Sequence, residues 1–252
     1  MTALRERKQF DVDSGLPASE LAALNSPTWF EHAKAYVLMK WPKAAAKQRA
    51  SIAEALATLT TAFISTSRGA PDTKVTRHAL YAWAFRALRR HDGTFVSRDA
   101  LENPPADVVA ALAWIGKHSL KVTEAAQPDR LRVALDALSV RLDGKPAAEN
   151  TAHRKRMVLS NAMRYAVERD VLKANPLGHI DWTAPDKEDE IEFRYVPNPK
   201  QAAALIAAVR EQGVRGEHLA AFFGCLYYAA MRPSEIADLR AADCRLPATG
   251  WG

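Results

Sequence analysis

The feature that most constrains the fold is a helical spacing of apolar residues that continues through almost the whole chain. Alanine is abundant, whereas the alternating β-branched residues that mark strands are scarce. Prolines, glycines and asparagines interrupt the pattern at places that suit helix ends. Apolar residues make up 48% of the 252 residues, enough to bury a sizeable core. We therefore predict an all-α protein.

Breaks in the pattern divide it into separate helices. Ser26 followed by Pro27 is typical of an N-cap and first turn, and Asn198 followed by Pro199 repeats that signal later in the chain. Gly93, Asn103, Pro104 and Pro105 predict a loop over 91–107. The helices that we expect cover residues 28–41, 43–64, 74–90, 106–120, 128–142, 152–172, 200–213, 217–230 and 233–244.

Composition excludes several classes of protein. Two cysteines, Cys225 and Cys244, cannot build a disulfide framework, and this predicts a reducing, cytoplasmic location. Neither cysteine has the spacing of a metal site, so we expect no metal. The first 15 residues lack the apolar centre of a signal peptide. No apolar run approaches the 18 residues of a membrane span, so we expect no membrane contact.

Charge divides the chain unevenly. Residues 1–180 hold 27 basic and 18 acidic residues, whereas residues 181–252 hold 8 and 11. A basic first part favours a polyanionic partner such as nucleic acid, although solvated arginines on ordinary surfaces would give the same count. Residues 181–192 carry six acids and one lysine, and this predicts a linker over 181–196, or else a solvated loop within one domain.

The 152–172 helix is amphipathic. At about 100° per residue, Val158, Leu159, Ala162, Tyr165 and Ala166 share one side. His153, Arg156, Ser160 and Arg164 share the other, with Arg154 beside them. Arginine forks fit phosphate oxygens and a serine lets the backbone approach, so this face suits DNA, or is simply solvated. The DNA-contacting residues that we expect are Arg154, Lys155, Arg156, Ser160, Arg164, Lys47 and Arg49.

A single arginine, Arg232, separates two apolar helical runs near the end of the chain. The 217–230 run is apolar on nearly all sides, which predicts a buried helix, and Pro233 can begin the next one. Phosphate groups favour a helix start, and Glu235 lies three residues on, where it can orient Arg232. The alternative is an Arg232–Glu235 pair that only ties the turn.

The segment YYAAMRPSEIADLRAADCRL resembles the first catalytic box of the tyrosine recombinases, the phage-integrase family, and is most similar to integrases of the actinobacterial type. Upstream, 161–180 resembles the last helix of the family's core-binding domain with its closing Asn-Pro, and 196–209 its first catalytic-domain helix. The usual glycine two residues before the arginine is Ala230, which a positive φ would strain. The positions that match the box are Arg232, Glu235, Ile236, Leu239 and Asp243.

The resemblance implies four parts in chain order. They are an N-terminal tail over 1–25, a helical (SAM-like) core-binding domain over 26–180, the acidic linker over 181–196, and the first helices of a catalytic domain over 197–252. It implies double-stranded DNA with attachment-type sites as the partner, and it allows homo-oligomers on DNA. It assigns Arg232 to a scissile phosphate, with Glu235 as its orienting acid.

The resemblance implies a reaction that uses no metal and no nucleotide cofactor, but this reaction needs more protein groups than Arg232 and Glu235. A tyrosine attacks the phosphate and forms a 3′-phosphotyrosine, and a lysine and a second arginine box stabilise charge. No tyrosine or histidine follows Arg232. The His153–Arg156 spacing lies on the wrong side of Arg232 to be that box, and Tyr227 and Tyr228 lie in the expected buried helix. We therefore expect a truncated recombinase that binds DNA without cutting it.

Two other functions remain open at the level of sequence. One is a non-enzymatic helical DNA-binding regulator, in which the helices around Arg232 form a helix-turn-helix. Against it, the 233–244 helix is poor in base-reading residues. The other is a helical protein-interaction module, which predicts negligible affinity for DNA even at low salt. The recombinase alternative predicts binding that weakens steeply as salt rises.

Overall fold

The computed structural model describes residues 15–141, 143–183, 193–244 and 249. It separates into two compact units, 1–188 and 189–252, and the boundary falls within the segment expected to be a linker. The expected tail is described from residue 15 onward. Residues 184–192 of the expected linker, and 245–248 and 250–252 at the end, lie outside the described residues.

The described residues are mostly helical, which confirms the all-α class, with one two-stranded antiparallel sheet. The first unit is formed by α2 (Ala18–Asn25), α3 (Trp29–Lys40), η1 (Trp41–Lys43), α4 (Ala46–Ala62), α5 (Thr73–His78), η2 (Ala79–Ala84), β1 (Ala87–Arg89), β2 (Phe95–Ser97), α6 (Arg98–Leu101), α7 (Ala106–His118), α8 (Val122–Ala125), α9 (Pro128–Leu138), α10 (Glu149–Glu168) and η3 (Pro176–His179). The second contains η4 (Phe193–Tyr195), α11 (Pro199–Arg210), η5 (Gly213–Arg215), α12 (Gly216–Tyr228), α13 (Pro233–Asp238) and η6 (Ala241–Asp243).

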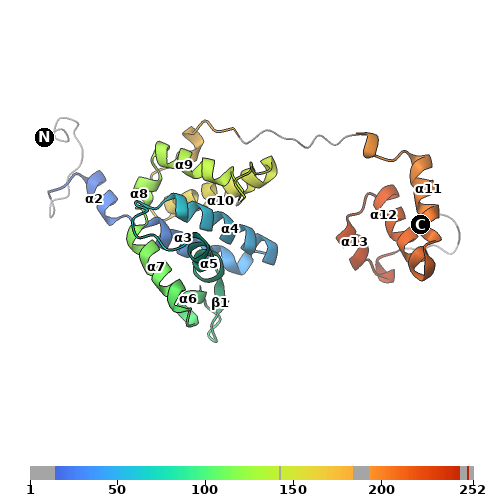
Figure 1. Ribbon diagram of the computed structural model, residues 1–252, viewed down its shortest axis with the longest axis horizontal. Helices are drawn as coiled ribbons and strands as arrows, with labels where there is room; N and C mark the ends of the chain where they lie inside the picture. The colour runs from blue at the N-terminus through green and yellow to red at the C-terminus, as the bar shows by residue number, and fades with distance from the viewer. Residues whose placement is uncertain (1–14, 142, 184–192, 245–248, 250–252) are drawn as a thin grey trace. The chain divides into compact units, whose positions relative to one another are not determined.

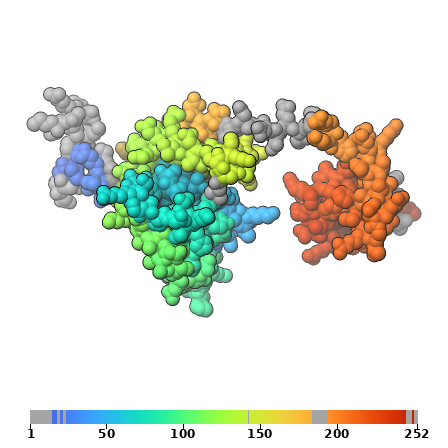
Figure 2. Space-filling view, viewed as in Figure 1, coloured from blue at the N-terminus to red at the C-terminus, as the bar shows by residue number. Residues whose placement is uncertain are grey.

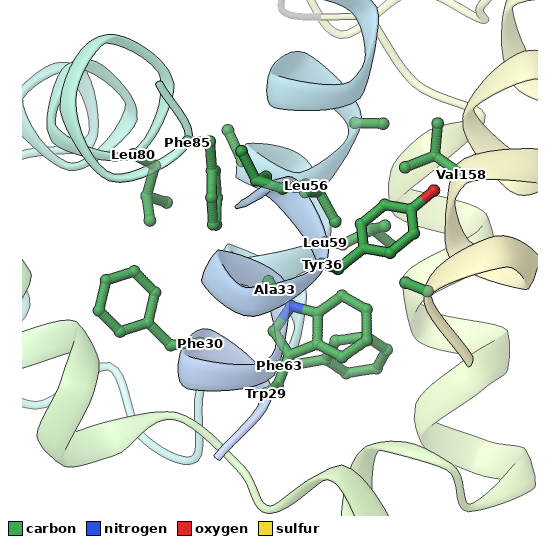
Figure 3. Packing of buried hydrophobic residues seen from close by; sticks show 14 of the residues in the cluster. Trp29, Phe30, Ala33, Tyr36, Leu56, Leu59, Phe63, Leu80, Phe85 and Val158 are labelled. Atoms are coloured by element: carbon green, nitrogen blue, oxygen red, sulfur yellow. The ribbon is translucent and has the colours of Figure 1, made fainter. Parts of the chain in front are cut away.

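Helix α4 is the centre of the first unit. It packs against α3, α9, α10 and η2, so its apolar residues are covered on several sides. Leu56 and Leu59 are fully buried there. The rings of Trp29 and Phe63 pack edge to face, with their centroids 4.8 Å apart (Figure 3). The buried Trp29 Nε1 donates to Thr60 Oγ1 at 3.1 Å, which satisfies the polar end of the indole. This core fixes α3, α4 and α10 relative to one another.

The N-cap of helix α3 lies two residues later than the sequence predicts. Thr28, not Ser26, is the N-cap, and Glu31 completes a capping box with it. Ser26 is buried instead, and its hydroxyl accepts from the Thr123 N–H at 3.4 Å. Both residues are good caps. Tertiary burial of Ser26, which the local sequence does not show, decides between them.

The expected 74–90 helix is wrong in its second half. After α5 the chain forms the π-helical η2 and then β1, which pairs with β2 from the expected loop. The register joins Ala87 to Ser97 and Arg89 to Phe95. Gly93 has φ 86° in the connecting turn, a conformation that glycine adopts without strain. The hairpin therefore depends on a turn that the helical spacing of 74–90 conceals.

Each unit is packed as a body of its own, as the space-filling view shows (Figure 2). The second is small, and α11 against α12 is its main contact. Asn198 caps α11 as predicted, with Gln201 completing a capping box. Gly216, at the start of α12, lies so close to the end of α11 that an added Cβ would stand 2.0 Å from the Arg210 carbonyl oxygen.

Candidate nucleic-acid interface

Helix α10 carries most of the residues expected to contact DNA. Its buried side includes Leu159, Ala162 and Ala166, in agreement with the predicted amphipathic pattern. Arg154 and Arg164 are exposed, whereas Arg156 and Ser160 are half-buried. Two of the expected contact residues on this helix are therefore exposed, and Arg156 and Ser160 are only partly accessible.

Lys155, which was expected to contact DNA, does not share the exposed side of α10 with Arg154. Its side chain is on the buried side of α10, and Nζ lies 3.2 Å from the Glu54 carboxylate on α4. Lys155 stands three residues after Ala152, and spacings of three place residues on the same side of a helix. The side chains of adjacent residues in a helix point about 100° apart, so adjacent basic residues do not form a continuous patch.

Arg156 is oriented by an aromatic contact. Its guanidinium lies 5.5 Å from the ring centroid of Trp182, which also meets the His153 ring edge-on at 5.8 Å. The Arg156 Nε is buried and has no hydrogen-bond partner among the described residues. Arg156 therefore supports the packing of the 181–183 segment on α10 as well as carrying charge.

Lys47 and Arg154 lie in the same groove, which has a volume of about 400 Å³. A third cation, Lys40 from the end of α3, also lines it, and its Nζ lies 5.9 Å from the Tyr36 ring centroid. Arg154 is steadied by donating to the Asn150 carbonyl at 3.2 Å and to Thr151 Oγ1 at 3.3 Å. The described residues that line the groove are Tyr36, Lys40, Lys47, Gln48, Ser51, Ile52, Arg154, Met157, Val158 and Asn161.

The charge of this groove has one sign, since none of its described lining residues is acidic. Three cations without a carboxylate among them attract a polyanion, and the low-dielectric walls strengthen that field. Lys40 was not among the residues expected from sequence. Its position at the end of an apolar helix gives no local signal, and only the packing of α3 against α4 and α10 brings it beside Lys47 and Arg154.

The other residues expected to contact DNA, Arg164, Ser160 and Arg49, bind neighbouring protein groups. Arg164 hydrogen-bonds to Asn161, which lines it. Ser160 accepts from Asn175 Nδ2 at its hydroxyl, at 3.2 Å, and at its carbonyl. Arg49 donates to the Trp41 carbonyl at 3.0 Å and stacks on that indole at 5.1 Å. Ser160 and Arg49 thus have structural partners, and neither lines the groove.

The expectation of a buried site around Arg232 is wrong for the second unit as described. Of the residues of α12, only Gly216 and Ala220 are buried. Phe223 is 41% exposed and Tyr228 is 65% exposed, so Tyr228 is not a core residue. Tyr227 is half-buried and its hydroxyl donates to the Pro197 carbonyl at 3.0 Å. Helix α11 makes the main contact with α12 and α13 makes a smaller one, which leaves Phe223 and Tyr228 exposed.

Glu235 holds Arg232 as predicted, in an exposed setting. One carboxylate oxygen accepts from the Arg232 backbone N–H and the other from Nη1, both at 2.8 Å. The backbone hydrogen bond first, and the guanidinium second, lower the pKa of Glu235 below its ordinary value. The Arg232 side chain is 80% exposed. Ala230 has φ 52°, so the turn before Arg232 adopts a left-handed conformation. The recombinase family usually has a glycine at this position, and alanine is strained there.

The described residues hold no cluster of three or more metal-ligating side chains, and Cys225 and Cys244 are free thiols. Within the same residues, no helix has both the length and the apolar character needed to cross a membrane.

Comparisons with known proteins found no family model, no curated protein and no solved structure that matches this chain.

Proposed function

We propose that this chain is the DNA-binding N-terminal portion of a tyrosine recombinase, and that these 252 residues bind double-stranded DNA without cutting it. The observation that carries the binding part is the groove in which Lys40, Lys47 and Arg154 converge without an acid among its described lining residues. The assignment to recombinases rests on the residues of the Arg232 box and on the order of the elements before it.

In this proposal the groove contacts the phosphate backbone. Lysine and arginine side chains that neutralise phosphates release condensed counterions, and this gives affinity without sequence preference. Arg164, which is exposed and adjoins the groove through Asn161, extends the same surface. Base readout is assigned to no residue.

Arg232 has a separate role in the proposal. Glu235 accepts from Nη1 of the guanidinium, and the two remaining nitrogens, Nε and Nη2, are the donors proposed to meet a phosphate. Exposure of 80% makes that guanidinium accessible to DNA. Because no tyrosine or histidine follows Arg232 in the sequence, the nucleophile and the second arginine box of the recombinase reaction are not available within these residues.

The regulator alternative has less support. A helix-turn-helix places its second helix in the major groove, and α13 has only six residues, Pro233–Asp238. That is under two turns, too short to reach several base pairs.

Fluorescence anisotropy with labelled duplex DNA tests the proposal. The expected result is binding at low salt that falls steeply between about 50 and about 200 mM salt. A suicide substrate should give no covalent adduct. Absence of binding at low salt would favour the protein-interaction module, and an adduct would contradict the claim that these residues do not cut DNA.

A further inference from the structure

A second cavity, of about 490 Å³, is lined by residues of α4, α5, α9 and α10 and of the segment between α9 and α10. It shares no lining residue with the basic groove, although both use α4 and α10. Its volume is within the range that small-molecule sites occupy. The cavity therefore qualifies as a ligand site distinct from the DNA-binding groove.

Two cations share one carboxylate oxygen in this cavity. Lys155 Nζ lies 3.2 Å from Glu54 Oε1, and Arg77 Nη2 lies 3.8 Å from the same atom. Lys155 is only 9% exposed. A lysine ammonium has three N–H donors and a guanidinium has five, so a single shared oxygen leaves donors without an acceptor. Lys155 is mostly buried, whereas the side chains of Arg77 and Glu54 are 29% and 43% exposed, so an anion that enters from solvent can reach the donors that Glu54 leaves free.

The rest of the lining does not cancel this excess of positive charge. Arg141 and Asp143 pair with each other at 3.1 Å at an exposed position, so they contribute no net charge. The lining consequently carries a net charge of +1. A ligand with one negative charge would balance it, whereas a cationic ligand would face Lys155 and Arg77 with only Glu54 to attract it.

The remaining wall residues have small side chains and are equally divided between apolar residues and threonines. They leave space beside Lys155, Arg77 and Glu54 for an apolar group. The threonines add hydroxyl groups to the walls. These wall residues are Ala57, Thr58, Thr61, Thr73, Ala137, Val140, Ala147 and Thr151.

We propose that this cavity binds a small organic monoanion. The charged group of the ligand lies against Lys155 and Arg77, and its apolar body lies against the alanine and valine walls. The proposal is independent of DNA binding, because the groove residues Lys40, Lys47 and Arg154 take no part in it.

A series of probes with one body and different charges tests the proposal. Phenylbutyrate, its neutral amide phenylbutyramide and the cationic phenylbutylamine are titrated into the full chain by calorimetry and by amide NMR. We expect phenylbutyrate to bind with a dissociation constant of about 1 mM or tighter, and at least about tenfold more tightly than the other two. Shifted amides should belong to Lys155, Arg77 and Ala137.

Two substitutions should change the affinity in opposite directions. Lys155→Met removes a cation and should weaken phenylbutyrate binding about tenfold. Glu54→Gln removes the competing anion and should strengthen it. A loss of folding would weaken binding in both variants, so the opposite signs identify a direct effect. Arg77→Met, at a more exposed position, provides a second test of the cation's role and should also weaken binding.

Lys47→Met is the matched control outside the cavity, and it should leave phenylbutyrate binding unchanged. The proposal is overturned if the amide or the amine binds as tightly as the acid, if the shifts map elsewhere, or if no binding occurs at several millimolar acid. Weaker binding in Glu54→Gln would also overturn it.

Discussion

Glu235 accepts hydrogen bonds from both the backbone N–H and the guanidinium of Arg232, at 2.8 Å each. The carboxylate thus closes the first turn of α13 and fixes the arginine at once. The sequence spacing predicted the pair, but the structure changes its setting. Arg232 stands at an exposed helix start, and the polar pair is held by local hydrogen bonds without burial.

Replacing Arg232 with Met should raise the pKa of Glu235 only part of the way to its ordinary value. The backbone N–H of residue 232 is the larger cause of the lowered pKa, and it survives the substitution. Carbon-detected NMR titration of the Glu235 carboxylate measures this. Arg240→Met is the control and should leave the pKa unchanged. Complete restoration in Arg232→Met would show that the side chain alone lowers the pKa.

Ala230→Gly should stabilise the second unit by about 0.5–1 kcal/mol. Alanine at φ 52° carries a left-handed strain of about 1–2 kcal/mol, partly offset by the greater freedom of glycine in the unfolded chain. Urea unfolding, followed by NMR signals of α12, measures the change. Ala229→Gly is the matched control. Residue 229 has φ −102°, so glycine has no strain to relieve there, and stabilisation in this control would refute the explanation.

Gly216→Ala should destabilise the second unit. A methyl group at this position would stand 2.0 Å from the Arg210 carbonyl oxygen, so α12 would have to move away from α11. Gly224 is in the middle of the same helix, and a Cβ added there would meet no atom within 4 Å, so Gly224→Ala should be neutral or stabilising because alanine favours the helix. Limited proteolysis compares the two, and equal resistance would contradict the predicted contact.

The stability of the first unit should fall as the pH drops below about 6.5. Burial lowers the pKa of His32, whose Nε2 lies 2.8 Å from the Ala162 carbonyl oxygen and whose buried Nδ1 has no partner among the described residues. The unfolded chain takes up a proton near pH 6.5, whereas the native state takes it up only at lower pH. The free energy of unfolding therefore falls with pH through this window.

His32→Gln removes the titrating group but keeps a side-chain N–H donor, so it should flatten the pH dependence between about pH 6.5 and the lowered pKa. Urea unfolding at several pH values measures the slope. The exposed His91 is the control, and His91→Gln should leave the slope as it is. An unchanged slope in His32→Gln would assign the pH dependence to other groups.

Local patterns in the sequence predicted the elements whose ends have strong signals. Asn198 and Pro199 predicted the start of α11, and the spacing of Arg232 and Glu235 predicted the contact between these two side chains. The helical spacing of 74–90 failed at β1, because this strand depends on pairing with residues around Phe95, which helix periodicity does not report. The prediction that Ser26 caps α3 failed because Ser26 is buried and accepts a hydrogen bond from Thr123, whereas Thr28 caps the helix.

The residues of the candidate groove were likewise predictable only where the local sequence pattern places them. Amphipathicity identified the exposed Arg154, but it could not show that Lys40 joins it, because that contact depends on how α3, α4 and α10 pack. Grouping Lys155 with its neighbours failed since adjacent residues of a helix point in different directions. Its partner, Glu54, is about 100 residues away in the sequence.

The salt dependence of DNA binding in Arg154→Met, Lys47→Met and the double variant tests the central claim most directly. Each groove cation that contacts a phosphate should lower the slope of log affinity against log salt by about one when it is removed. Lys117→Met, at an exposed position on α7, is the control. We predict a reduction of about two in the double variant and none in Lys117→Met. An unchanged slope in the double variant, with duplex DNA still bound, would contradict the assignment of this groove.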